Sequence, residues 1–237
     1  MKKRLINLFA PILVALIVTT SLVTLPTNVS GQNSLQYETI NFMKNVLSVD
    51  TSTYTIEFKG EHTFDDLPLT TAGRKITYID YTLSSKDSNI DISFRVEKGT
   101  IAGCDISPIP AQIIATTQYN NPLVAAQGFL ERYQTFTKSD LSNLIAILNN
   151  VDTTKDTTIT TESTKLEIKN VFLGVDQTIF VWSRIINGAD YASLELVFDK
   201  DGNFIIMIDS RTIFTIGDTT VNYLPLPRQA FTASNIG

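Results

Sequence analysis

The chain has 237 residues, of which 43% are hydrophobic and 18% are charged, and its formal net charge is −5. This composition excludes an intrinsically disordered chain and a coiled coil, and it suffices for one large or two small folded domains. The negative charge repels phosphate backbones, so we expect no nucleic-acid partner.

The N-terminal segment, residues 1–31, predicts export. Three Lys or Arg residues precede an apolar run over 5–25, and small residues follow it. A charged start, an apolar middle and a small-residue exit are typical of a signal peptide. The run is also long enough to cross a bilayer, because about 20 helical residues span about 30 Å. We therefore expect an extracytoplasmic protein, either secreted after cleavage or anchored through 5–25.

The rest of the chain indicates two similar α+β units, 33–110 and 121–218, and an irregular tail, 219–237. One constant offset aligns VDTS (49–52) with VDTT (151–154) and Tyr78-Ile79 with Phe180-Val181. It also aligns Ile92, Phe94 and Val96 with Leu194, Leu196 and Phe198. Collinear matches of this kind are typical of an internal repeat. Each unit is predicted to be a helix packed on an antiparallel sheet.

Three helices are predicted from apolar spacing. In the first unit the stripe is Tyr37, Ile40, Met43 and Leu47. In the second unit it is Leu141, Leu144, Ile145 and Leu148, with Ser139 as N-cap. Between them an additional helix begins at the cap Asn121 and Pro122, with the stripe Val124, Phe129, Leu130 and Tyr133.

The strands of the second unit are the clearest. Asn187-Gly188 separates two strand-like runs, which is typical of a hairpin because both residues tolerate positive φ. Leu194, Leu196 and Phe198 give the strand one apolar face while Glu195 points the other way, which predicts a sheet covered on one side by a helix. Cys104 is the only cysteine, so no internal disulfide forms, and we expect it buried in a strand. We expect no cofactor.

Residues 199–203, Asp-Lys-Asp-Gly-Asn, raise the question of a calcium loop. An EF-hand loop requires Gly at its sixth position and a bidentate Glu at its twelfth. Here Gly is fourth and Ser210 is twelfth. Asp and Gly are also typical of a tight turn, so we interpret this stretch as a hairpin turn without a metal.

The one histidine, His62, lies beside Glu61, Asp65 and Asp66. This group is the alternative metal or acid–base site, and it would make the chain a secreted metal-dependent hydrolase. Zinc sites usually draw on several His or Cys ligands, so we favour a polar loop between strands. The sequence has no Gly-x-Ser-x-Gly, no His-Glu-x-x-His and no Gly-x-x-x-x-Gly-Lys-Ser/Thr motif, and we assign no catalytic residue.

Binding residues are predicted on the strands. Trp182 and Arg184 lie two residues apart on one strand face, and aromatic–arginine pairs are frequent binding hot spots. The other interpretation, which we favour, is that Trp182 packs under the helix while Arg184 extends to the sheet edge. Tyr78 is the counterpart residue in the first unit. The predicted surface is Trp182 to Phe204 with Tyr78 to Val96.

The run FVWSRIINGADYASLELVFDKDGNFIIMID (180–209) resembles PepSY-type domains, in which a helix packs on an antiparallel sheet in a cystatin-like manner. The residues that carry the resemblance are Trp182, Asn187, Gly188, Phe198, Asp199, Gly202 and Phe204. The chain also looks like a group of archaeal exported proteins built from such units. The resemblance implies an association with protease inhibition, chaperoning or ligand binding at the cell surface.

These observations predict a non-enzymatic extracytoplasmic binding or regulatory module. Its partner is expected to be a protein or peptide at the cell surface, added as a strand to an open sheet edge. Two other functions remain open: the hydrolase based on His62, and a structural component of the cell surface.

Overall fold

The computed structural model describes residues 33–65, 75–108 and 115–211. The predicted export segment, the irregular tail and Asp66 lie outside these ranges. No helix in the described part of the chain combines the length and the apolar composition needed to cross a membrane.

The described residues form helices α1 to α3, a 3-10 helix η1 and strands β1 to β9. In chain order these are α1 (Asn33–Asn45), β1 (Thr55–Asp65), β2 (Lys75–Ser84), β3 (Asn89–Glu97), β4 (Thr100–Ser107), α2 (Pro122–Thr137), α3 (Ser142–Ala146), η1 (Ile147–Asn150), β5 (Thr157–Thr160), β6 (Thr164–Phe172), β7 (Asp176–Ile186), β8 (Ala189–Asp199) and β9 (Phe204–Asp209).

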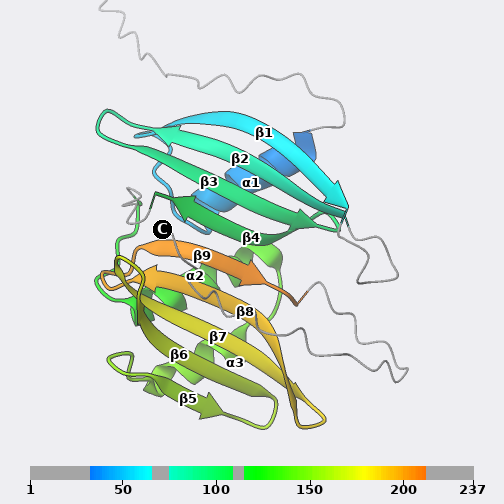
Figure 1. Cartoon of the computed structure of the whole chain (residues 1–237), viewed down its shortest axis with the longest axis vertical. Coiled ribbons are helices and arrows are strands. Elements are labelled where there is room, and N and C mark those ends of the chain that lie inside the picture. Colours follow the sequence, from blue (N-terminus) through cyan, green and yellow to red (C-terminus); the bar gives the residue numbers. More distant parts are fainter. Residues whose placement is uncertain (1–32, 66–74, 109–114, 212–237) are drawn as a thin grey trace, which may run out of the picture. The chain divides into compact units, whose positions relative to one another are not determined.

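The described strands form one antiparallel sheet in the order β1-β2-β3-β4-β9-β8-β7-β6-β5 (Figure 1). The predicted α+β class is confirmed. A separate sheet for each predicted unit does not form, because pairs such as Cys104 with Met207 join β4 to β9 at the centre. Strands β1 and β5 are the two edges.

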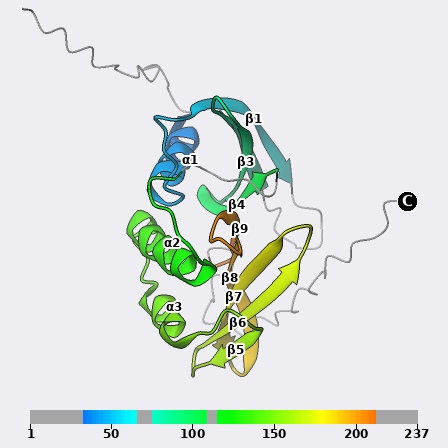
Figure 2. The ribbon, with the colours of Figure 1, turned by 90° about the vertical axis from the view of Figure 1, so that its left-hand side faces the viewer.

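All three α-helices lie on the same face of the sheet (Figure 2). Every second residue of a strand faces the helices. On β2 these residues are Ile79, Tyr81 and Leu83, and each is at most 2% exposed. Leu194, Leu196 and Phe198 are buried on β8 in the same way, as predicted. No helix of residues 33–65, 75–108 or 115–211 lies on the other face of the sheet (Figure 2).

One hydrophobic core lies between the helices and the sheet. Phe42 of α1 is fully buried, and its ring meets Phe94 of β3 at 5.7 Å between centroids. It also meets Tyr133 and Phe136 of α2 at 5.9 and 5.5 Å. The two halves of the chain therefore share their core.

Helix α2 begins as predicted, because Asn121 Oδ1 accepts the Val124 N–H at 2.9 Å and Pro122 is the first helical residue. Two predicted core positions are wrong. Val124 is 45% exposed, since the buried stripe of α2 runs through Ala125 and Phe129. Tyr37 is 65% exposed, since the buried face of α1 centres on Phe42 and its neighbours.

The predicted helix after Ser139 begins later and is shorter. Lys138 ends α2 with φ 56°, and the Leu141 N–H donates to Gln134 Oε1 at 2.6 Å. Helical structure begins at Ser142, whose N–H donates to Asp140 Oδ1 at 3.0 Å. Ser139 is therefore not the N-cap, because the helix begins three residues later, at Ser142.

The predicted hairpin at Asn187-Gly188 forms, with φ of 51° and 77° at these residues. The proposed alignment of β2 with β7 is displaced by one residue. On β2 the buried Ile79 pairs with Phe94, which the alignment matches to Leu196. On β7 the buried residue that pairs with Leu196 is Phe180, not Val181. Adjacent strand residues face opposite sides, so Val181 does not correspond to Ile79.

Cys104 is buried in β4, as predicted, and is 2% exposed. Burial raises the pKa of its thiol well above the usual range, so the side chain stays protonated. It acts as a small apolar residue of the core.

Candidate functional site

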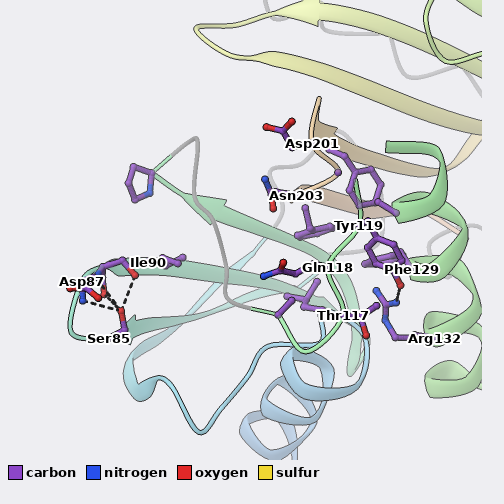
Figure 3. A pocket seen from close by; sticks show the side chains of 18 of the residues that line it. Ser85, Asp87, Ile90, Thr117, Gln118, Tyr119, Phe129, Arg132, Asp201 and Asn203 are labelled. Atoms are coloured by element: carbon purple, nitrogen blue, oxygen red, sulfur yellow. Dashed lines mark hydrogen bonds between the residues drawn. The ribbon is translucent and has the colours of Figure 1, made fainter. Parts of the chain in front are cut away.

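A cavity of about 680 Å³ opens where two hairpin turns approach α2 and the segment 115–119 (Figure 3). Its size is in the range of small-molecule sites, which is about 300–1,000 Å³. The described lining residues are Leu47, Ser85, Asp87, Ser88, Asn89, Ile90, Pro108, Ala115, Thr117, Gln118, Tyr119, Ala125, Phe129, Arg132, Phe198, Asp201, Gly202, Asn203 and Phe204.

The turn between β8 and β9 forms one wall of the cavity, and it is the predicted hairpin turn. Asp199 Oδ1 accepts the N–H groups of Asp201 and Asn203 at 2.9 and 2.8 Å, and its Oδ2 accepts from Asn203 Nδ2 at 2.8 Å. Both carboxylate oxygens thus bind donors of the turn itself, which a calcium ion would have to displace. Gly202 takes φ 85° at the tip.

The turn between β2 and β3 forms another wall. The Ser85 N–H donates to Ser88 O at 2.8 Å, and the Ser88 N–H donates to Ser85 Oγ at 3.1 Å. Asp87 is exposed at the tip of this turn, and Asp201 is exposed at the tip of the other. Figure 3 shows these two carboxylates on separate turns, away from Arg132.

Helix α2 contributes Ala125, Phe129 and Arg132 to the cavity, and the spacing i, i+4, i+7 places them on one face of the helix. Phe129 stacks on Phe204 of β9 with centroids 5.4 Å apart and planes 3° apart. Phe129 is 1% exposed, so Phe204 is the ring of this pair that presents aromatic surface to the cavity.

Arg132 is held at the base of the cavity by two neutral oxygens. Its Nε donates to Val46 O, just after α1, at 2.7 Å, and its Nη1 donates to the Tyr119 hydroxyl. The guanidinium carbon also lies 5.5 Å from the centroid of the Tyr119 ring. Within the described residues no ion pair joins Arg132 to a carboxylate.

Gly128 explains how Tyr119 reaches this position. A Cβ atom at residue 128 would lie only 2.2 Å from the Tyr119 hydroxyl. Any other residue type would displace the phenol, so the glycine in the middle of α2 makes room for the hydrogen bond to Arg132.

The three sequence-predicted binding residues lie outside this lining. Trp182 is fully buried under the helices, and its Nε1 donates to Leu144 O at 3.2 Å. Arg184, two residues further along β7, is exposed. Tyr78 lies half-buried on the face without helices, with its ring 6.0 Å from that of Phe64. The structure therefore does not bring the three together.

The His62 group is also divided. His62 lies within β1 rather than in the loop that we expected, opposite Tyr78 on β2. Glu61 is opposite Ile79 and thus on the other face of the sheet. Asp65 ends β1, and Asp66 lies outside the described residues. In the described ranges no three His, Cys, Asp or Glu side chains gather as metal ligands.

The sequence interpretation missed Arg132, Tyr119 and Gln118. The one signal was Gly128, since a glycine inside a helix costs about 1 kcal/mol relative to alanine and often indicates close packing. No family model, no curated protein and no solved structure matches the chain.

Proposed function

We propose that this chain is a non-enzymatic, extracytoplasmic binding or regulatory module whose ligand occupies the cavity between the two hairpin turns and α2. The observation that carries the proposal is the cavity itself, which combines an aromatic wall with polar groups from several elements. Gln118, Asn203 and Arg132 supply amide and guanidinium groups that fix the orientation of a ligand.

The lining favours binding over bond cleavage. Its titratable side chains in the described residues are Asp87, Asp201, Tyr119 and Arg132. The two carboxylates lie on different turns, and His62 is on β1 rather than among the described lining residues. The export segment predicted from the sequence supports an extracytoplasmic site of action.

We also infer that the two halves derive from one PepSY-like unit. Asp50 Oδ1 accepts from the Ser52 N–H and Oγ at 3.0 and 2.6 Å, and Asp152 Oδ1 accepts from the Thr154 N–H and Oγ1 at the same distances. These are the turns of the VDTS and VDTT matches. Local turns of one type at matched places support a duplication.

The strands carry a second sign of duplication. The pairing of β3 with β4 shifts register between Arg95 and Val96, and the pairing of β8 with β9 shifts between Val197 and Phe198. These positions coincide under the offset that aligns the VDTS and VDTT turns. Bulges tend to persist within a family, so matched bulges favour a common origin of the halves.

A fluorescent probe tests the cavity. N-phenyl-1-naphthylamine, a neutral aromatic dye, should bind the full-length chain and become fluorescent in the aromatic lining. Gln118→Trp should abolish this signal, because residue 118 is exposed and extends into the cavity (Figure 3). The control Thr158→Trp places the same ring on exposed β5 and should leave binding unchanged. Equal dye binding by all three proteins would refute the cavity as a ligand site.

A second candidate is peptide addition at β1. This edge strand exposes Phe58 and Phe64 by 42% and 58%, and Phe64 contacts Tyr78, one of the predicted binding residues. Among the described strands β1 pairs with β2 alone, and an edge strand with aromatic anchors suits an added strand. A mixture of extended peptides should then slow hydrogen exchange in β1, and Phe64→Ser should remove that protection while Gln118→Trp should not.

A further inference from the structure

We propose that the cavity selects a ligand with an apolar or aromatic body and a single anionic group, and that Arg132 binds that anionic group. This inference rests on the proposed binding function and specifies the ligand class.

Arg132 carries a positive charge that its hydrogen-bond partners do not neutralise. The side chain is half-buried, and both of its hydrogen-bond acceptors, Val46 O and the Tyr119 hydroxyl, are neutral. A guanidinium carries five N–H donors, so about three remain after these two bonds. Among the described residues no carboxylate forms an ion pair with this half-buried cation, so an anion that enters the cavity would stabilise it.

The orientation of the Arg132 guanidinium is fixed by its neighbours. Val46 O and Tyr119 hold the guanidinium from two sides, and Gly128 keeps Tyr119 in place. Figure 3 shows the guanidinium directed from α2 toward Thr117 and Gln118, which line the same cavity. A side chain already held in place loses little conformational entropy when it binds a ligand.

The rest of the cavity lining is partly aromatic and partly acidic. The half-buried Phe204, whose ring stacks on the buried Phe129, gives the cavity an aromatic side that suits an apolar body. Asp87 and Asp201 at the turns repel additional negative charge, which disfavours phosphates and other polyanions. The combination favours a monoanion such as an aromatic or aliphatic carboxylate or sulfonate.

A matched pair of dyes tests the inference on the full-length chain. 8-Anilinonaphthalene-1-sulfonate has the same aryl body as N-phenyl-1-naphthylamine but adds one sulfonate. We expect the sulfonate dye to bind about tenfold more tightly, which is the size of effect that one charged hydrogen-bonded contact supplies. Arg132→Gln should remove this preference and leave the affinity for the neutral dye within about twofold. The control Arg184→Gln removes an exposed arginine outside the cavity and should preserve it.

The outcomes separate the two proposals. If the neutral dye binds in a manner that Gln118→Trp abolishes, but the sulfonate dye binds no better, the anion preference is overturned and the binding function stands. If neither dye binds in that manner, the binding function is overturned as well.

Salt dependence covers the case in which Arg132→Gln fails to fold. Added salt should weaken binding of the sulfonate dye to the unmodified chain and leave the neutral dye unaffected. Equal behaviour of both dyes with salt would overturn the anion preference without any variant.

Discussion

The Tyr133 hydroxyl of α2 donates to Asp209 Oδ2 at the end of β9 across 2.7 Å, and both residues are only 1% exposed. Arg211 completes the group, with its Nε 2.9 Å from Asp209 Oδ1 and its Nη2 2.5 Å from Oδ2. Burial and the Asp209 carboxylate raise the pKa of Tyr133, so the phenol remains a donor. This group ties the helical layer to the last described strand.

Tyr133→Phe should therefore lower the free energy of unfolding by about 1–2 kcal/mol, because a buried carboxylate loses one of its donors. Urea unfolding of the two proteins measures the difference. Tyr37→Phe removes a hydroxyl from a residue that is 65% exposed and should change stability by less than about 0.5 kcal/mol. Equal effects of the two substitutions would mean that the buried hydrogen bond contributes nothing.

Gly128→Ala should destabilise the protein although alanine favours helices by about 1 kcal/mol over glycine. The added Cβ would lie 2.2 Å from the Tyr119 hydroxyl and would displace the phenol from Arg132. In a Tyr119→Ala background the obstacle is absent, and the same substitution should become stabilising. Thermal unfolding of the four proteins tests this reversal of sign, and a destabilisation in both backgrounds would contradict the explanation.

Gly202→Ala and Gly99→Ala should differ, although both residues have positive φ, 85° and 75°, in hairpin turns. At Gly202 a Cβ would lie 2.8 Å from Asn121 O at the start of α2, whereas at Gly99 nothing lies within 4 Å. Gly99→Ala should cost about 1–2 kcal/mol for the backbone alone. Gly202→Ala should cost more, and equal losses in urea unfolding would exclude a role for the contact with Asn121.

Asp105→Asn should stabilise the protein at neutral pH. Asp105 is exposed on β4, but neighbouring groups partly withdraw its carboxylate from water, and this desolvation together with the nearby Asp80 raises its pKa above the ordinary value of 3.8. Between these two pKa values the folded chain binds more protons than the unfolded chain, so stability falls as pH rises through that window. Above it the ionised carboxylate is disfavoured, and asparagine removes that penalty.

Urea midpoints of the unmodified chain and of Asp105→Asn, measured at about pH 7 and about pH 3, check this direction. At the lower pH the aspartic acid is largely protonated and therefore uncharged like asparagine, so the advantage of asparagine should vanish there. Asp87→Asn, on the exposed turn between β2 and β3, is the control. An advantage of Asp105→Asn that is the same at both pH values would have another cause than ionisation.

Local patterns predicted the secondary structure well where the cause is local. Asn121 and Pro122 begin α2 because a side-chain oxygen and a preset φ act within a few residues. Asn187-Gly188 and the residues 199–203 form turns for the same kind of reason. Ser139 failed as a cap because Gln134, in the preceding helix, binds the N–H of Leu141.

Nothing local predicted the cavity. Tyr119 and Arg132 meet because Gly128 leaves room on α2 and because Val46, just after α1, supplies an acceptor. Trp182 is a core residue, as in the favoured of its two interpretations, and only the structure could decide this because alternation along a strand does not distinguish a face covered by helices from an interface.

By itself the sequence determined the α+β class, the alternation of the strands and the turn residues, because capping, φ preference and side-chain periodicity are short-range effects. Only the tertiary structure decided that β4 pairs with β9 in one sheet and that Arg132 faces a cavity. Those contacts join residues far apart in the chain, and their energies depend on packing that no short window of sequence contains.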